Sequence, residues 1–362
     1  MAASDQAELR EAARAQAEFA AFNAAFEQAT ATAGGAVTDT FLIAGKKVLI
    51  EFAGPALVPY LTPAIGHLRA TFEGEPDLRI RAWDSKSTGV PLPAAAGDLE
   101  EHQQRGMPGS WGRGTVLSAY LRPDPGLSIF DFETSEGVYW LPDAVRTPYE
   151  DRSGPFRGIL NWYMSRNGRQ FIHGAAIGDD HGDGLLVVGK SGSGKSTTAL
   201  TCLLAGVKYA GDDYCLLEPG SHPRVHSLYA SAKLHGDHLK RFPELEPKLA
   251  NPHRIEIEKG VLLLGEHFPD RIVRELVPRA IAVPRVTGEP ETRVVPVGRP
   301  RALAALAPSS LLQLASTREE SMRMMADLIR QLPAYELQLG TDLQQIPDVI
   351  RGLLACLADR DG

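Results

Sequence analysis

The clearest chemistry in the chain lies in eight consecutive residues that match the pattern G-x-x-x-x-G-K-[ST] at every fixed position: Gly189, Lys190, Ser191, Gly192, Ser193, Gly194, Lys195 and Ser196. Glycines in such a loop let successive backbone N–H groups point at phosphate oxygens, and the helix N-terminus that follows adds positive potential. Lys195 can reach the β- and γ-phosphates, and the Ser196 hydroxyl can ligate Mg²⁺. The run, with Thr197 after it, predicts a site for ATP and Mg²⁺.

Two other glycine patterns do not fit these residues. A dinucleotide fingerprint is excluded because Gly192 and Gly194 lack the third glycine that it needs. A nucleophile elbow, G-x-S-x-G, is excluded because Ser193 stands where its last glycine should be.

Two adjacent acids, Asp212 and Asp213, follow 17 and 18 residues after Lys195. In a P-loop fold we expect their strand to run beside the phosphate loop, so that an acid there holds Mg²⁺. Neighbouring carboxylates repel, and one of them would therefore have a raised pKa suited to taking a proton from an attacking hydroxyl. On an extended segment the two side chains would point to opposite sides. This geometry leaves open which acid does which; a solvated turn is the structural alternative.

His173 and Gly174 end a segment that we expect to be the strand before the phosphate-loop strand. If those two strands are neighbours, His173 can also reach the phosphates. The alternative is a hydrogen-bonded histidine at a strand end with no role in chemistry.

The elements that must position these residues change character along the chain. Residues 1–150 predict a smaller α+β domain, with a helix over 5–30, a long loop over 84–113, and strands at 41–52, 78–83, 115–121, 127–132 and 137–141. Residues 151–362 predict an α/β domain because strand and helix patterns alternate with short connections. Its expected helices are 157–166, 191–206, 235–242, 318–331 and 347–358, and its expected strands are 170–178, 184–189, 209–218, 254–264, 280–286 and 292–297.

Composition limits the other possibilities. The chain has 362 residues, of which 43% are hydrophobic and 23% charged, which fits two globular domains and not a disordered, collagenous or coiled-coil protein. The net charge of −7 favours neither nucleic acid nor a membrane as partner, and no apolar run is long enough to span a bilayer. The N-terminal segment lacks the features of a secretory signal, and Cys202, Cys215 and Cys356 form no CxxC pair. We expect a reducing cytoplasmic location.

The order His173-Gly174, phosphate loop, Asp212-Asp213 resembles the C-terminal catalytic domain of the HPr kinase/phosphorylase family. That family has a P-loop kinase domain related to phosphoenolpyruvate carboxykinase, and it phosphorylates a serine on a small carrier protein. The resemblance is dense from about residue 170 to 218. It implies that His173 and Lys195 are catalytic, that Ser196 and Asp212 hold magnesium, and that Asp213 is the proton acceptor.

The rest of the chain departs from that family. There is no clean copy of its E-x-R-G-x-G signature, and the partial echo at 254–264 makes Glu256 or Glu258 the candidate for a second metal ligand. Arg279 and Arg285 are the candidates for its catalytic arginine. The N-terminal half does not match the family's regulatory domain.

The longer pattern of motifs resembles HPr-kinase-like serine kinases that accompany peptide-modification gene clusters, including those for lasso peptides. This resemblance implies an ATP- and Mg²⁺-dependent kinase acting on a serine of a small protein or precursor peptide, in some homo-oligomer, with residues 1–150 serving acceptor recognition or assembly. Two alternatives stay open: a small-molecule kinase or carboxykinase-like phosphotransferase on the same fold, and a nucleotide-gated binding protein without phosphoryl transfer.

Overall fold

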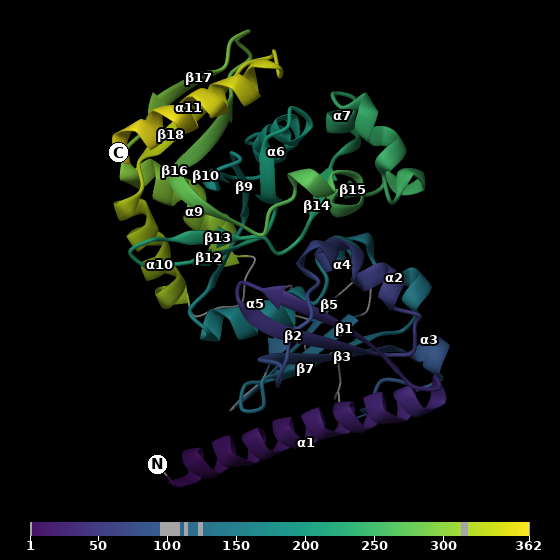
Figure 1. The fold of residues 1–362 in the computed structure, drawn as a ribbon. Coiled ribbons are helices and arrows are strands. Elements are labelled where there is room, and N and C mark those ends of the chain that lie inside the picture. Colours follow the sequence, from purple (N-terminus) through teal and green to yellow (C-terminus); the bar gives the residue numbers. More distant parts are fainter. Residues whose placement is uncertain (1, 95–108, 112–114, 122–125, 313–317, 362) are drawn as a thin grey trace. The chain divides into compact units, whose positions relative to one another are not determined.

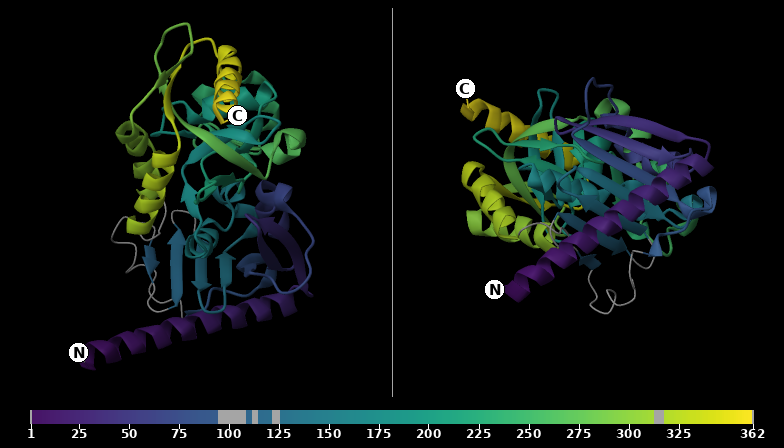
Figure 2. Two further views of the ribbon diagram at one scale, coloured as in Figure 1. Left: turned by 60° about the vertical axis from the view of Figure 1, so that its left-hand side comes forward. Right: turned by 90° about the horizontal axis from the view of Figure 1, so that it is seen from below.

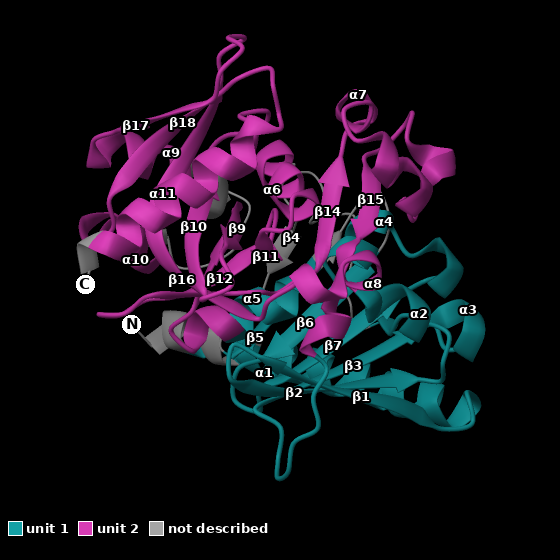
Figure 3. Ribbon diagram, turned by 45° about the horizontal axis from the view of Figure 1, so that its top comes forward, with its two compact units in different colours: residues 1–63, 69–163 teal, residues 64–68, 164–362 magenta. Residues whose placement is uncertain are grey.

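The computed structural model describes residues 2–94, 109–111, 115–121, 126–312 and 318–361 (Figure 1). The chain divides into two compact units, which Figure 3 shows in different colours. Unit 1 comprises Met1–Pro63 and Arg69–Tyr163, and unit 2 comprises Ala64–Leu68 and Met164–Gly362. Each unit has its own sheets and its own hydrophobic core. No helix among the described residues is long and apolar enough to cross a membrane.

Unit 1 is a mixed seven-stranded sheet covered on one face by a long helix, α1 (Ala2–Thr32). The strand order is β1-β2-β3-β7-β6-β5-β4, with parallel pairs only at β2–β3 and β3–β7 among the described strands. The bounds are β1 Ala36–Ile43, β2 Lys46–Ala53, β3 Leu78–Asp84, β4 Gly109–Trp111, β5 Val116–Leu121, β6 Gly126–Asp131 and β7 Glu136–Leu141. Its short helices are α2 Val58–Leu61, α3 Ser85–Thr88, η4 Ala144–Arg146 and α4 Tyr149–Ser153. The helix η1 (Pro63–Leu68) belongs to unit 2 except for its first residue.

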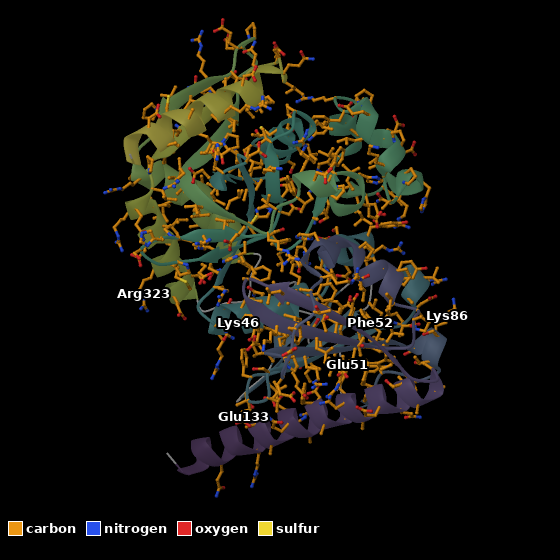
Figure 4. The ribbon with its side chains drawn as sticks, in the orientation of Figure 1. Lys46, Glu51, Phe52, Lys86, Glu133 and Arg323 are labelled. Atoms are coloured by element: carbon orange, nitrogen blue, oxygen red, sulfur yellow. The ribbon has the colours of Figure 1, made fainter. Side chains whose placement is uncertain are left out.

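Helix α1 lies along the sheet of unit 1 in both views of Figure 2. It buries Phe22 and Phe26 in one core with Trp83 of β3. Side chains of strand β2 alternate between two environments: Phe52 is buried against Phe156, whereas Glu51, the preceding residue, pairs with Arg79 of β3 (Figure 4). The helix and the strands expected in this part of the sequence are therefore confirmed.

The expected loop at 84–113 is only partly described, and the described part is not all loop. Asp84 accepts a hydrogen bond from Ser87 N–H at 2.9 Å and so begins the short helix α3, while residues 109–111 form β4. Residues 95–108 and 112–114 lie outside the described residues. The sequence missed α3 because a single helical turn has no measurable periodicity.

The units divide between Tyr163 and Met164, within helix α5 (Arg157–Arg166), whereas the sequence placed the domain border at 150/151. The first turns of α5 belong to the core of unit 1. A Cβ on Gly137 would lie 2.6 Å from Ile159 Cγ2, and the Tyr163 ring meets Phe130 edge-on at 6.3 Å between centroids. A helix that crosses a border cannot be divided by composition alone.

Unit 2 has a nine-stranded sheet in the order β11-β9-β10-β16-β13-β12-β8, with β18 and β17 added beside β16, and a separate pair β14–β15. The strands are β8 Gln170–Ile172, β9 Gly174–Gly178, β10 Asp183–Val188, β11 Lys208–Gly211, β12 Cys215–Glu218, β13 Arg224–His226, β14 Ser231–Leu234, β15 Gly260–Leu263, β16 Glu275–Val286, β17 Arg293–Pro296 and β18 Ala334–Leu339. The helices are α6 Lys195–Leu204, α7 Gly236–Leu239, η5 Pro243–Lys248, η6 Pro252–Arg254, α8 Leu264–His267, η7 Pro269–Arg271, α9 Arg299–Leu312, α10 Arg318–Gln331 and α11 Gln345–Asp361.

Strand β10 shows how unit 2 is layered. Leu185 and Val187 point into a core that contains residues of α6 and α11, and Leu186 and Val188 point into a core that contains residues of α9 and α10. Helices therefore cover both faces of this part of the sheet, and β10 pairs in parallel with β16, which pairs in parallel with β18. The mixed α/β class expected for this part of the chain is confirmed. The expected strand at 254–264 is shorter than expected, because only Gly260–Leu263 is extended.

Candidate nucleotide site

The phosphate-loop residues connect the end of β10 to the start of α6. Gly194, the residue before the helix, has φ +109°, a left-handed conformation that favours glycine. A Cβ at this position would lie 2.3 Å from Leu339 Cδ1 of β18. Two independent constraints, backbone conformation and close packing, therefore require glycine at 194.

The Lys195 side chain is buried inside this loop. Its ammonium donates hydrogen bonds to the carbonyl oxygens of Gly189 at 2.8 Å and Lys190 at 3.2 Å. Burial lowers the pKa of Lys195 from its ordinary value, while the charges of Asp212 and Asp213 oppose that shift. The ammonium is thus held by carbonyl oxygens of the loop itself.

The diacid follows β11, which is not the direct neighbour of the phosphate-loop strand. Strand β11 pairs with β9, and β9 pairs with β10, so β11 lies one strand away from the phosphate-loop strand. Asp212 nevertheless reaches the loop, because its carboxylate accepts a hydrogen bond from Ser196. The turn after β11, and not the strand itself, makes this contact.

The diacid itself is a tight turn and not an extended segment. Asp213 has φ +66°, Tyr214 N–H donates to the Asp212 carbonyl oxygen at 2.8 Å, and Asp213 N–H donates to Asp212 Oδ1 at 2.9 Å. The premise that an extended backbone separates the two carboxylates is therefore wrong. The side chains still have different partners: Asp212 is bonded to Ser196, and Asp213 lies beside Lys233 and His173.

Asp212 has the features expected of a metal ligand. It is 2% exposed, and its Oδ2 atom has no hydrogen-bond partner among the described residues. Burial and then the Asp213 charge raise its pKa, while the bond from Ser196 opposes the rise. A buried carboxylate oxygen without a partner is costly unless a cation satisfies it, and the adjacent Ser196 hydroxyl would supply a second hard oxygen atom.

Within the described part of the chain, no three His, Cys, Asp or Glu side chains lie together as a metal site. Such a cluster is not needed for Mg²⁺ at a triphosphate, because Mg²⁺ keeps several waters and binds through few protein ligands plus phosphate oxygens. Ser196 and Asp212 fit that smaller ligand set.

Asp213 is held by basic and aromatic neighbours. Lys233 Nζ lies 2.9 Å from Asp213 Oδ2, and His173 Nε2 lies 3.6 Å from Asp213 Oδ1. Burial alone would raise the pKa of Asp213, but Lys233 and His173 hold it well below its ordinary value. The sequence predicted that one acid of the pair has a raised pKa; that acid is Asp212, and the proposed proton acceptor is the one whose pKa is lowered.

His173 lies between β8 and β9 and not at the end of one long strand. Strand β9 is the antiparallel neighbour of β10, with Gly174 opposite Val188, so His173 lies at the edge of the sheet where the phosphate loop begins. The expected neighbourhood of these strands is confirmed. The Tyr214 ring packs 5.8 Å from the His173 ring, between centroids.

Asp213, His173, Lys233 and Tyr214 form one cluster of side chains. The sequence did not identify Lys233 and Tyr214 as members of it. Lys233 is on β14 and pairs with Asp213, and its ammonium also lies 6.0 Å from the centroid of the Tyr214 ring. Lys233 is the one charged residue in the segment 227–234, and a lone lysine in an otherwise apolar and small-residue strand was the available signal. Tyr214 gave no signal beyond its place after the diacid.

The candidate arginines are placed differently from each other. Arg279 pairs with Asp183 at 2.7 Å, and Asp183 begins β10, so this pair is at the opposite end of the strand from the loop. Arg285 follows Pro284, which lies beside Gly194, and its Nε donates to the buried Glu336 at 2.9 Å. Of the two, only Arg285 is at the loop end of the sheet.

The candidate second metal ligands lie in the segment between β14 and β15. Glu258 accepts hydrogen bonds from Arg254 at 2.5 Å and Asn251 at 3.3 Å. Glu256 and Glu258 both line a cavity formed by residues 235–259. These two hydrogen bonds of Glu258 are thus local to that segment.

Comparison with known proteins gives matches among solved structures and no match by sequence. No family model matches the chain, and no curated protein matches it. Among solved structures, the HPr(Ser) kinase/phosphatase from Coxiella burnetii matches with 12% sequence identity and a TM-score of 0.30, covering 53% of this chain and 99% of that one. A structural similarity at this TM-score does not assign an activity to this chain.

Proposed function

We propose that the protein is an ATP- and Mg²⁺-dependent kinase that transfers the γ-phosphate to a serine hydroxyl of a small protein or precursor peptide. One observation carries the proposal. The two adjacent aspartates have separate partners: Asp212 is bonded to Ser196 of the phosphate loop, and Asp213 lies between Lys233 and His173. A site of this kind has one acid for the metal and a second acid for an acceptor.

The residues divide the reaction between them. The loop N–H groups and Lys195 bind phosphate oxygens, and Ser196 with Asp212 would hold Mg²⁺, which neutralises charge on the transferring phosphoryl group. Asp213 accepts a hydrogen bond from the serine hydroxyl and orients it toward the γ-phosphorus. As the serine O–P bond forms and the bond to the β-phosphate oxygen breaks, Asp213 receives the hydroxyl proton and ADP leaves.

The lowered pKa of Asp213 is compatible with this role. Phosphoryl transfer passes through a loose transition state in most analyses, so the hydroxyl needs orientation more than early deprotonation. A carboxylate kept ionised by Lys233 and His173 is always ready to accept the hydroxyl hydrogen bond. His173, at the loop end of the sheet, supports the γ-phosphate side of the site.

The proposal is tested by incubating the full chain with γ-labelled ATP and Mg²⁺, with and without candidate serine-containing polypeptides. Label on a polypeptide serine supports the kinase proposed here. Label on a metabolite would assign a small-molecule kinase instead, and nucleotide binding without transfer would assign a nucleotide-gated binding protein. A switch needs only one acid that organises the metal, so the second, separately held acid favours transfer.

A further inference from the structure

Unit 2 contains a cavity of about 820 Å³ that none of the proposed catalytic residues lines. It is formed within the segment that connects β14 to β15. The lining residues are His235, Gly236, Asp237, Leu239, Lys240, Pro243, Glu246, Ile255, Glu256, Ile257, Glu258 and Lys259. Its volume falls in the range of small-molecule pockets, roughly 300–1,000 Å³.

Strand register places this cavity beside the diacid. Lys233 of β14 is opposite Val261 of β15, and Lys233 bonds to Asp213. His235 and Lys259 line the cavity two residues further along each chain segment, about 7 Å away at the usual rise of a strand. The lining of the cavity therefore begins two residues from Lys233, the partner of Asp213.

A shared core fixes the cavity relative to the phosphate loop. Leu239, which lines the cavity, is buried in one core with Leu200 and Leu203 of α6, the helix that begins at Lys195. Strand β14, which leads into the lining of the cavity at His235, also packs against α6. A single ligand could contact both the loop and the cavity.

The lining suits a neutral, flat and hydroxylated ligand better than a phosphate. Leu239, Pro243, Ile255 and Ile257 supply apolar surface, and the side chain of Ile257 is available because the residue is 75% exposed. Four carboxylates, Asp237, Glu246, Glu256 and Glu258, outnumber the two lysines of the lining. Carboxylates accept hydrogen bonds from ribose hydroxyls and repel phosphate, whereas an aromatic base packs on aliphatic side chains.

We propose that this cavity holds the base and ribose of the nucleoside triphosphate whose phosphates bind the loop at 189–196. The proposal depends on the proposed function only in taking that loop as the triphosphate site. The phosphates are then recognised by backbone N–H groups and Lys195, and the nucleoside by the segment 235–259.

The test compares two ligands that differ only in the nucleoside: Mg·ATP and magnesium tripolyphosphate. Equilibrium affinities of both are measured for the full wild-type chain, for Ile257→Asp, which puts a charge where the base packs, and for Glu246→Gln. Wild type should bind ATP at least ~10-fold more tightly than tripolyphosphate, and Ile257→Asp should lose most of that difference, since partial burial of an isoleucine is worth about 1.4 kcal/mol, a factor of ten. Tripolyphosphate affinity should not change in either variant.

Val145→Asp is the matched control, because Val145 is also an exposed aliphatic residue, at 65%, and belongs to unit 1. It should leave both affinities at the wild-type values. Equal ATP affinity in wild type and Ile257→Asp would overturn the proposal. If Ile257→Asp kept the wild-type ATP affinity but changed the KM for a serine-bearing acceptor, the cavity would be assigned to the acceptor. If wild type bound tripolyphosphate and bound ATP no more tightly than tripolyphosphate, the assignment of the cavity to the nucleoside would fail. The assignment of the loop to the triphosphate would stand. Binding of neither ligand would instead remove the proposed function.

Discussion

At the scale of residues, the division of labour within the acid pair is the most informative feature of the site. The presence of two acids, their distance from Lys195 and the expectation of different roles all came from the sequence. The sequence could not show how the two acids come to have different partners. That depends on the left-handed backbone of Asp213 and on Lys233, which is 20 residues further along the chain. Side-chain partners from other strands have no signature in local periodicity.

The acid pair should separate kinetically. Asp213→Asn keeps the size of the side chain but removes its basic oxygen, so Mg·ATP should still bind while transfer falls by ~10²–10⁴. Asp212→Asn should weaken Mg²⁺ dependence and nucleotide binding together, because the partnerless Oδ2 is lost. Nucleotide affinity and turnover are measured for both variants. If Asp213→Asn loses Mg·ATP binding while Asp212→Asn loses only turnover, the two roles are reversed.

Removal of the metal tests the Ser196–Asp212 pair. We expect EDTA to abolish transfer and Mg²⁺ or Mn²⁺ to restore it, since both ligands are hard oxygen donors. Transfer rates are followed during titration with each cation. Transfer that continues at full rate in excess EDTA would contradict the metal assignment.

At the scale of elements, the phosphate loop and its flanking strand and helix were predictable because each has a strong local signal. The buried strand reads as an apolar run, and the loop pattern marks the start of the helix. The strand order was not predictable: a diacid strand one place removed from β10, and a hairpin from β14 and β15 that carries Lys233, are products of tertiary pairing. Segments such as 254–264 look strand-like by alternation yet begin with a 3₁₀ turn, η6.

Gly194 ends the phosphate loop and packs against Leu339 of β18. Its substitution should therefore strain the backbone of the loop and disturb this packing. Gly194→Ala places a Cβ on a residue with φ +109° and 2.3 Å from Leu339 Cδ1, so we expect a loss of roughly 2 kcal/mol or more in the free energy of unfolding. Gly192→Ala is the control, because Gly192 also has positive φ, +77°, but has open space around its Cβ position. Urea unfolding measures both. Equal losses would show that contact with Leu339 contributes nothing.

At the scale of the whole molecule, the chain forms two units that do not follow the order of the sequence. The short segment Ala64–Leu68 belongs to unit 2 although residues on both sides of it belong to unit 1. Within unit 2, His67 Nε2 and the Ser227 hydroxyl are 2.7 Å apart, and Ala230 N–H donates to the Ala64 carbonyl oxygen at 2.8 Å. A five-residue insertion of this kind lacks any compositional boundary, so the sequence placed one border where the structure has three.

This segment should make stability depend on pH. Burial, and next the charge of Arg274, lowers the pKa of His67 to about 4. The unfolded chain therefore binds a proton near its ordinary pKa of ~6.5 while the folded chain does not, and stability is complete above that value and falls as pH decreases toward 4. The loss attributable to His67 should be about 2–3 kcal/mol at pH 4.5.

The His67 prediction is measured by urea unfolding at several pH values between 7.5 and 4.5. His67→Gln retains a hydrogen-bonding side chain without titration, so its free energy of unfolding should fall less steeply with decreasing pH than that of wild type. Parallel pH profiles for the two proteins would show that His67 is not the group responsible.

The central claim, phosphoryl transfer at the loop that contains Lys195, is tested most directly by measuring label transfer from γ-labelled ATP to a polypeptide serine for wild type and Lys195→Ala side by side. Lys195 is buried in the loop with its ammonium on the Gly189 and Lys190 carbonyl oxygens, and removing that charge leaves the phosphates without their principal cation from the protein. We predict Mg²⁺-dependent transfer by wild type and a loss of at least ~10²-fold in Lys195→Ala, the scale of removing one charge-stabilising group. Transfer by Lys195→Ala at the wild-type rate would show that phosphoryl transfer does not take place at this loop.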